Sequence, residues 1–121
     1  MKDLRIAAVT MQSEPGKIEK NLEKTASFVS RASDLGADFI CFPELSVSGY
    51  TLRDPAGVYS GVASGEVIEE VVRMARKKAL VILAGVIEIS GKGEPFISHV
   101  AAGPEGLLGI YRKTHLSPQE R

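Results

Sequence analysis

Cysteine and long apolar runs are both scarce in this sequence. Cys41 is the only cysteine among 121 residues, which excludes an internal disulfide and is typical of a protein in a reducing compartment. The apolar run between Arg5 and Thr10 is too short for the core of a signal peptide or for a membrane span. We therefore predict a cytoplasmic protein.

An excess of one charge sign is also missing. Fifteen basic and fifteen acidic side chains cancel, and no stretch is obviously polybasic. Nucleic acids and anionic membranes bind proteins through clusters of positive charge, so neither is expected as a partner. The length predicts one domain, large enough to bury a core but small for an enzyme with its own substrate pocket.

Signals for strands and helices alternate along the chain. Apolar runs at 4–10 and 39–42 predict buried strands, the second covered on both faces. Between them, and again after the potential cap Ser64, apolar residues recur at the spacing of a helix face. Gly36 and the basic run 76–78 mark where these helices are expected to end. The expected strands are 4–10, 39–42, 80–87, 96–102 and 107–111, and the expected buried helix faces are Ile18, Leu22, Ala26, Val29 and Ala32, then Val67, Ile68, Val71, Val72 and Ala75.

This order of elements predicts an α/β domain that ends in a meander of hairpins. The turns of the meander are expected at 90–93 and 103–106, which are rich in glycine. Residues 46–65 hold four glycines and a proline without a sustained period, so we predict a long surface loop there. A loop of this length beside the end of a strand is expected to serve function.

Two charged residues follow predicted strands. Glu44 is the first charge after the 39–42 strand, and ligands in α/β folds meet side chains at the carboxyl ends of strands, so it is a candidate general base. Lys113 follows the 107–111 strand, where an ammonium group can stabilise an oxyanion. The alternative interpretations are a solvated loop glutamate and a basic strand end that faces water.

Several short motifs together resemble the nitrilase superfamily of carbon–nitrogen hydrolases. The supporting features are an opening strand near residues 5–9, a turn at Gly16 and an Asn21-Leu22 pair early in the first helix. The resemblance covers the chain from residue 4 to residue 116. The motifs, in the order of that family, are FPEL at 42–45, SGY at 48–50, GPEG at 103–106 and YRKTHL at 111–116.

The resemblance implies an α-β-β-α sandwich and a Glu-Lys-Cys catalytic triad. Glu44 matches the general base of that triad, and Lys113 matches the lysine that stabilises the tetrahedral intermediate. The substrate would be a small amide or N-carbamoyl compound, less often a nitrile. No metal or organic cofactor is implied, and members of the family commonly form homo-oligomers through their helices.

The cysteine of that triad follows the lysine in the family, but no cysteine follows Lys113 here. Cys41 is a poor substitute, because it precedes Glu44 by three residues inside a predicted buried strand, where a thiolate is disfavoured. We therefore expect residues 1–121 to form the N-terminal part of a hydrolase domain whose nucleophile lies in a missing C-terminal part. Half a sandwich would expose an apolar sheet face and a strand edge, which favours association.

The sequence also departs from the family pattern. Ile97 stands where an asparagine is common and Thr10 where a glutamine is common. These departures touch the surroundings of the site rather than the base or the lysine, so they bear on the substrate and not on the reaction class. Glu120 is either the counterpart of an additional glutamate that some members place near the substrate or a solvated chain end, and Tyr50 is either an entrance residue or loop packing. His99 and His115 lack the spacing of metal ligands. We interpret His99 as packing or surface, and His115 as a neighbour of the lysine loop.

Three interpretations follow for the chain. The first is a part of a carbon–nitrogen hydrolase. The second is a binding or regulatory module that keeps the pocket without the nucleophile. The third is a structural α/β fragment in which Glu44 and Lys113 do not approach each other, and contact between these two side chains would exclude it.

Overall fold

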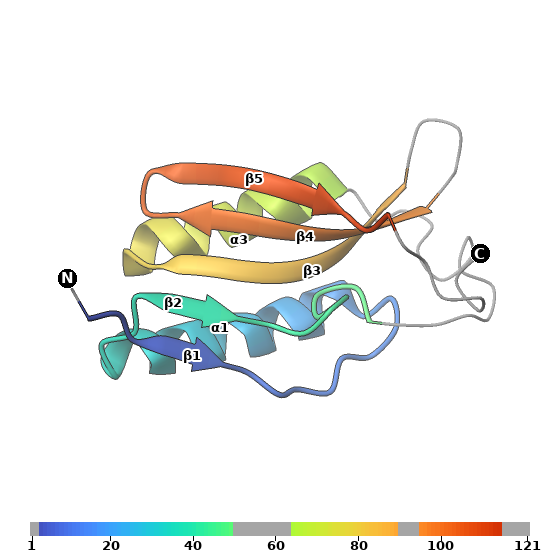
Figure 1. Cartoon of the computed structure of the whole chain (residues 1–121). Coiled ribbons are helices and arrows are strands. Elements are labelled where there is room, and N and C mark those ends of the chain that lie inside the picture. The colour runs from blue at the N-terminus through green and yellow to red at the C-terminus, as the bar shows by residue number, and fades with distance from the viewer. Residues whose placement is uncertain (1–2, 50–63, 90–94, 115–121) are drawn as a thin grey trace.

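The computed structural model describes residues 3–49, 64–89 and 95–114 (Figure 1). They form one five-stranded sheet with two helices against one of its faces, which confirms the predicted α/β class. Strand order across the sheet follows the sequence. The elements are β1 (Ile6–Ala8), α1 (Ile18–Asp34), β2 (Phe39–Cys41), α3 (Ser64–Lys78), β3 (Val81–Ile89), β4 (Pro95–Gly103) and β5 (Gly106–Arg112).

The directions of the strands decide which chain segments meet. β1, β2 and β3 are parallel, and β4 is antiparallel to both of its neighbours, β3 and β5. These two reversals return β5 to the direction of β2, and the two arrowheads point the same way in Figure 1. The segments that follow β2 and β5 therefore leave the sheet at the same end.

The core lies between the sheet and the helices. Ile40 of β2, Ile82 of β3 and Val100 of β4 are fully buried on the side that the helices cover. Val29 of α1 and Val71 of α3 meet them from the helix layer. Each helix thus presents one face to the sheet, as its apolar spacing predicted in outline.

The helix ends agree well with the prediction. α1 ends at Asp34, and Gly36 has a φ of 78°, the left-handed conformation expected just after a helix. α3 begins at Ser64 and ends in the basic run Arg76–Lys78. Neither of the two described helices is long and apolar enough to cross a membrane.

The predicted buried face of α1 is partly wrong. Ala26 is exposed, and the buried positions on that stretch are Asn21 and Thr25. The Thr25 hydroxyl donates to the Asn21 carbonyl at 2.8 Å, and the Asn21 amide donates to the backbone carbonyls of Glu14 and Val47. A search for apolar periodicity misses such positions, because these polar side chains are buried with their hydrogen bonds satisfied.

The strands were predicted in the right number and order but with inexact bounds. β1 is three residues long rather than the seven of 4–10, because it pairs at three positions with the equally short β2. β3 continues to Ile89 beyond the predicted end at Ile87, because its pairing with β4 extends that far. The predicted turn at 103–106 is confirmed between β4 and β5, whereas the turn at 90–93 lies outside the described residues.

β2 is not covered on both faces by the described chain, contrary to the prediction. Ile40 is fully buried, whereas its neighbours Phe39 and Cys41, which point to the opposite face, are half-buried. The expectation of a buried Cys41 thiol is corrected in the same way. The physical reason is that α1 and α3 both pack on the same face of the sheet.

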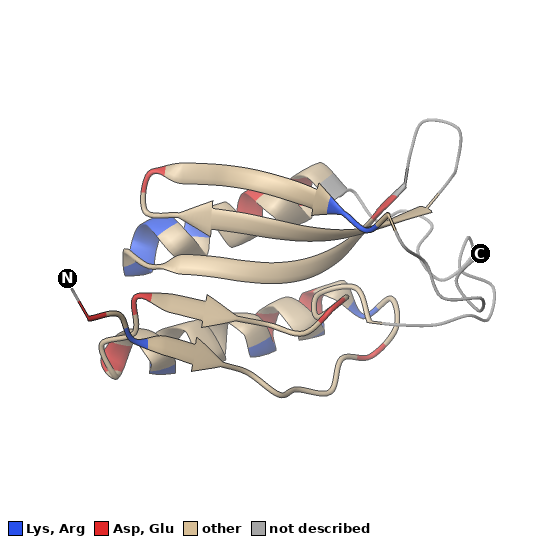
Figure 2. Cartoon of the chain, viewed as in Figure 1, with Lys and Arg blue, Asp and Glu red and all other residues tan. Residues whose placement is uncertain are grey.

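The opposite face, which we call the open sheet face, is largely apolar. Successive strand residues point to opposite faces, so the positions between the core residues belong to it. Ile6 and Tyr111 on this face are 65% and 64% exposed. Figure 2 shows charges on the helices and at the strand ends rather than along the middle of the strands. The open sheet face includes Ile6, Phe39, Leu83, Ala101 and Tyr111.

We expect the 121-residue chain to self-associate through the open sheet face, because association removes exposed apolar area from water. Ile6→Lys places a charge on this face at an exposed position, so it should weaken association with little effect on folding. Leu35→Lys is the matched control, since Leu35 is 72% exposed at the C-terminal end of α1. Light scattering over a concentration series measures the association of the two variants and of the unchanged chain. A monodisperse monomer for the unchanged chain would contradict this expectation.

Candidate functional site

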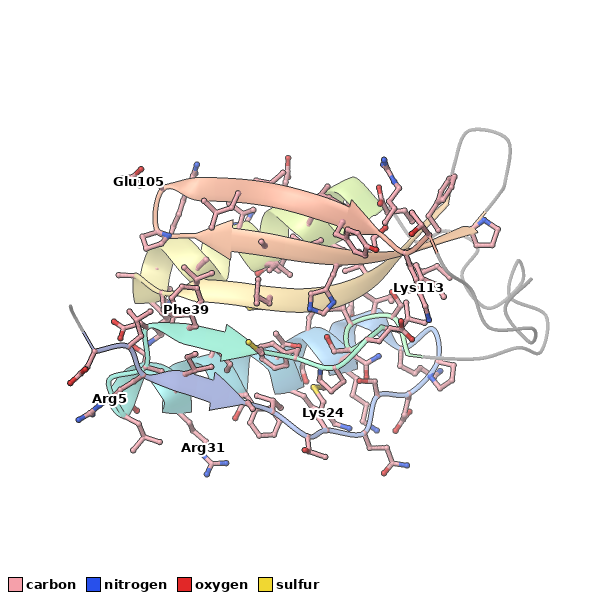
Figure 3. All side chains as sticks on the ribbon, viewed as in Figure 1. Arg5, Lys24, Arg31, Phe39, Glu105 and Lys113 are labelled. Atoms are coloured by element: carbon pink, nitrogen blue, oxygen red, sulfur yellow. The ribbon has the colours of Figure 1, made fainter. Side chains whose placement is uncertain are left out.

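Glu44 and Lys113 meet at the end of the sheet where β2 and β5 both finish. The Lys113 Nζ lies 3.0 Å from the Glu44 Oε1, and the two side chains are 28% and 48% exposed, respectively. Figure 3 shows Lys113 at this end of the sheet, opposite the turn that carries Glu105. The contact excludes the interpretation in which these two residues do not approach each other. Their roles in catalysis stay predictions.

The Glu44 segment is held by β3, although it has left the regular sheet. The Phe42 N–H donates to the Leu83 carbonyl at 2.8 Å, and the Val47 N–H donates to the Gly85 carbonyl at 2.9 Å. Between them, Leu45 has a φ of 54°, an unusual conformation for a residue with a branched side chain. The chain therefore makes a tight excursion at Glu44 and returns to the same strand.

Two serine hydroxyls complete this attachment. The Gly85 N–H donates to Ser46 Oγ at 3.1 Å, and the Ile87 N–H donates to Ser48 Oγ at 2.7 Å. The hydroxyls thereby bind N–H groups at the edge of β3 that faces this segment. Ser46 and Ser48 are buried, which corrects the prediction of a surface loop for this part of 46–65. Residues 50–63 of that loop, including Tyr50, lie outside the described residues.

Gly85 leaves the space through which this segment passes. A Cβ added to Gly85 would lie 2.2 Å from the Leu45 nitrogen and 2.8 Å from the Pro43 carbonyl oxygen. Backbone atoms cannot move aside as a flexible side chain can, so only glycine fits at this position of β3. The glycine therefore determines how closely Glu44 approaches the sheet.

Asn21 ties the same segment to the N-terminal part of the chain. Its Nδ2 donates to the Val47 carbonyl at 2.8 Å and to the Glu14 carbonyl at 2.9 Å, and its Oδ1 accepts from the Glu14 N–H. The Ser13 hydroxyl donates to the Ser46 carbonyl. α1 thus fixes the Glu44 segment from one side while β3 fixes it from the other.

Lys113 is fixed through its neighbour in sequence. The Lys113 N–H donates to the Ile97 carbonyl at 2.8 Å. Arg112 donates from two nitrogens to the two carboxylate oxygens of Glu88, at 3.0 and 3.1 Å, and also stacks over Phe96. The Glu88 side chain is 14% exposed and also accepts from the Ser98 hydroxyl.

The charge state of Glu88 follows from these contacts. Burial by itself raises the pKa of this carboxyl, but the hydrogen bonds from Ser98 and Arg112 and the positive charge of Arg112 outweigh it. The pKa of Glu88 therefore lies below its ordinary value. The ionised carboxylate holds the end of β5 in place, and with it the backbone of Lys113.

His99 of β4 belongs to the same neighbourhood. Burial lowers the pKa of this imidazole, and the negative charge of Glu44 opposes that effect in part. The net pKa is below the ordinary value of 6.5, so the ring is mainly neutral at pH 7. The sequence prediction for His99, packing or surface, left this electrostatic interaction with Glu44 out.

Two of the residues that the sequence analysis considered lie outside the described part of the chain. His115 and Glu120 lie beyond the described residues. In the described part of the chain, no group of three or more His, Cys, Asp or Glu side chains is arranged to hold a metal ion.

The sequence reasoning missed Gly85, Ser46, Ser48 and the Glu88–Arg112 pair, whose importance depends on which strands become neighbours.

Comparison with known proteins connects this geometry to a large group of enzymes. A sequence model of the family described as "Carbon-nitrogen hydrolase" matches residues 5–121. The chain is 31% identical over 121 residues to a nitrilase of Pyrococcus abyssi and covers 98% of its own length and 46% of that protein. It is 26% identical over 118 residues to an (R)-stereoselective amidase of a Pseudomonas species, covering 98% of itself and 42% of that protein.

The fold is similar to that of a solved amidase. A mutant of the amidase from Nesterenkonia sp. AN1, in which acrylamide has added to the active site cysteine, superposes with a TM-score of 0.87 at 22% identity. The match covers 98% of this chain and 47% of that one. The chain thus spans less than half the length of each of these relatives.

We expect Gly85→Ala to destabilise the fold by about 1–3 kcal/mol or more, because the new methyl group collides with backbone. Gly109→Ala on β5 is the matched control, since no atom lies within 4 Å of the position of its added Cβ. Urea unfolding of both variants measures the difference. Equal stability of the two variants would show that the Glu44 segment can move away from β3 freely.

We expect the Glu88 carboxylate to stabilise the fold above its ordinary pKa of 4.5, and this contribution to disappear as the pH falls through its lower pKa in the folded chain. Glu88→Gln should therefore cost about 1–3 kcal/mol at pH 7 and much less in acid. Glu105→Gln is the control, because Glu105 is exposed in the β4–β5 turn. The test is the free energy of unfolding of each variant and of the unchanged chain, measured from pH 7 downward. A loss of stability in Glu88→Gln that does not change with pH would contradict the expectation.

Proposed function

Because this chain belongs to the carbon–nitrogen hydrolase family, we propose that it supplies the general base and the lysine of a Glu-Lys-Cys site for hydrolysis of non-peptide C–N bonds. The substrate class we propose is a small amide or N-carbamoyl compound, in preference to a nitrile. The observation that supports this most directly is the 3.0 Å contact between the side chains of Glu44 and Lys113.

The two side chains suit the proposed chemistry. Glu44 is half exposed, so its carboxylate is open to a ligand while its backbone is held rigidly. A carboxylate in this position can accept the proton of a thiol. The partly buried Lys113 ammonium can stabilise the negative charge that develops on the substrate oxygen. Each group therefore has one role.

The proposed reaction has two halves. In the first, Glu44 accepts the thiol proton, the sulfur attacks the carbonyl carbon, and Lys113 stabilises the oxyanion of the tetrahedral intermediate. The C–N bond then breaks, and the leaving amine takes the proton from Glu44. In the second half, Glu44 accepts a proton from water as the water attacks the thioester. The acid product leaves, and the thiol is restored.

The nucleophile of this reaction is not among the 121 residues. No cysteine follows Lys113 in the sequence. We propose that these residues are the N-terminal portion of a longer hydrolase and that a further segment supplies the cysteine. The relatives support this, because the chain matches less than half of their length.

A second candidate is a binding module that holds small amides or carboxylates without hydrolysing them. The observation that favours it is the partly exposed pair of Glu44 and Lys113, which offers a carboxylate and an ammonium group to a ligand. In this case Lys113 would bind an oxygen of the ligand, and Glu44 would have no proton to accept from a nucleophile. The reading frame beyond Arg121 distinguishes the two candidates, since an apolar strand that ends in cysteine supports the hydrolase.

In the protein completed by its own reading frame, we expect Glu44→Gln to lower amide turnover by at least about 100-fold, because a glutamine cannot accept the thiol proton. Glu105→Gln is the matched control and should keep turnover. Ammonia release measures both variants, and circular dichroism checks that the fold is intact. Near-normal turnover in Glu44→Gln would remove this residue from the mechanism, and the 121-residue chain alone should release no ammonia.

A further inference from the structure

The ion pair of Glu44 and Lys113 spans the strand β4. Glu44 belongs to the segment that lies over Gly85 of β3, and Lys113 follows β5. β4 is hydrogen-bonded to both β3 and β5 and therefore lies between them. A side chain on the open sheet face of β4 at this end of the sheet must lie close to the pair.

His99 is the side chain in that position. It pairs with Gly85 of β3 on one side and with Tyr111 of β5 on the other. Directly paired residues share a face, with Cβ positions about 4.5–5.5 Å apart. The Cβ position of Gly85 lies against the Pro43–Leu45 backbone, so the His99 ring lies next to the segment that carries Glu44.

The other end of the ion pair belongs to the same part of the sheet. Tyr111, the partner of His99 on β5, precedes Lys113 by two residues, and the Lys113 N–H donates to the carbonyl of Ile97, two residues before His99. The half-buried imidazole therefore belongs to the strand between the two charged groups, and the negative charge of Glu44 acts on it.

We propose that His99 is a positioning residue of the candidate site. It is a third protonatable group, and when its ring is charged it competes with Lys113 for the Glu44 carboxylate. As the neutral ring, it leaves the carboxylate paired with Lys113 and free to act as a base. As the imidazolium, it attracts the carboxylate toward the sheet and away from Lys113. Only the effect on turnover depends on the proposed function, since the electrostatic coupling between His99 and Glu44 is a property of the folded chain.

The surrounding charges give the direction of this coupling. The groups that face the His99 ring are Glu44 from the segment after β2, Tyr111 from β5 and Lys113 just after β5, and its partner on β3 is an uncharged glycine. The carboxylate stabilises the imidazolium, so removal of its charge should lower the pKa of His99 further. At pH 7 the ring is then mainly neutral, and the competition begins only as the pH falls.

Selective ¹³C labelling of histidine tests this coupling in the 121-residue chain. The chain has two histidines, so the spectrum holds two signals and can be followed even in an oligomer; His115→Gln assigns them. We expect His99 to titrate below 6.5 and its pKa to fall further in Glu44→Gln. Glu105→Gln, which removes the same charge at the opposite end of the sheet, should leave it unchanged. An unchanged His99 pKa in Glu44→Gln would overturn the proposal.

The unsubstituted chain gives a second test that needs no variant near the site. Coupling is reciprocal, so the carboxyl carbon signal of Glu44 should change over the pH range in which His99 becomes charged. A Glu44 signal that does not change over that range would overturn the proposal. In the protein completed by its own reading frame, kcat/KM should fall at acid pH as His99 becomes charged. His99→Gln should remove this fall.

The two proposals can fail separately. Normal turnover in Glu44→Gln would refute the hydrolase mechanism while the histidine titration still reported the coupling. Absence of coupling, in turn, would refute the role of His99 and leave Glu44 as the base.

Discussion

The attachment of residues 42–49 to β3 is the constraint on which the candidate site depends. Backbone bonds from Phe42 and Val47 and hydroxyl bonds from Ser46 and Ser48 continue the sheet beyond the last regular residue of β2. The excursion between these bonds carries one charged residue, Glu44, outward. Because the bonds on both sides of it are buried, the position of its carboxylate depends on β3 more than on its own exposed surroundings.

The position of Lys113 depends on the same strand by a different route. β3 carries Glu88, whose carboxylate binds Arg112 with two hydrogen bonds, and Arg112 directly precedes the lysine. One strand thus positions both members of the ion pair, one through its backbone and a glycine, the other through a charged side chain near its C-terminal end. A displacement of β3 would affect both groups together.

Much of the fold could be predicted from the sequence, because apolar periodicity reports directly on which residues face a core. The number and order of strands and the ends of both helices followed from such local signals. Glu44 and Lys113 could be chosen as candidates because each follows a strand. Their contact also requires the two reversals of direction at β4, and the contacts of Gly85 and Glu88 require knowledge of strand register. Ala26 was misplaced because Asn21 and Thr25 satisfy their polarity inside the core, which a hydrophobicity pattern cannot register.

The Glu44–Lys113 contact also has a consequence for which ligands can bind at this end of the sheet. A neutral ligand such as an amide can hydrogen-bond to either side chain while the two opposite charges stay paired. A carboxylate is repelled by Glu44 and attracted by Lys113, so it has to replace Glu44 as the partner of the lysine in order to bind. The ion pair therefore favours neutral ligands over anionic ones.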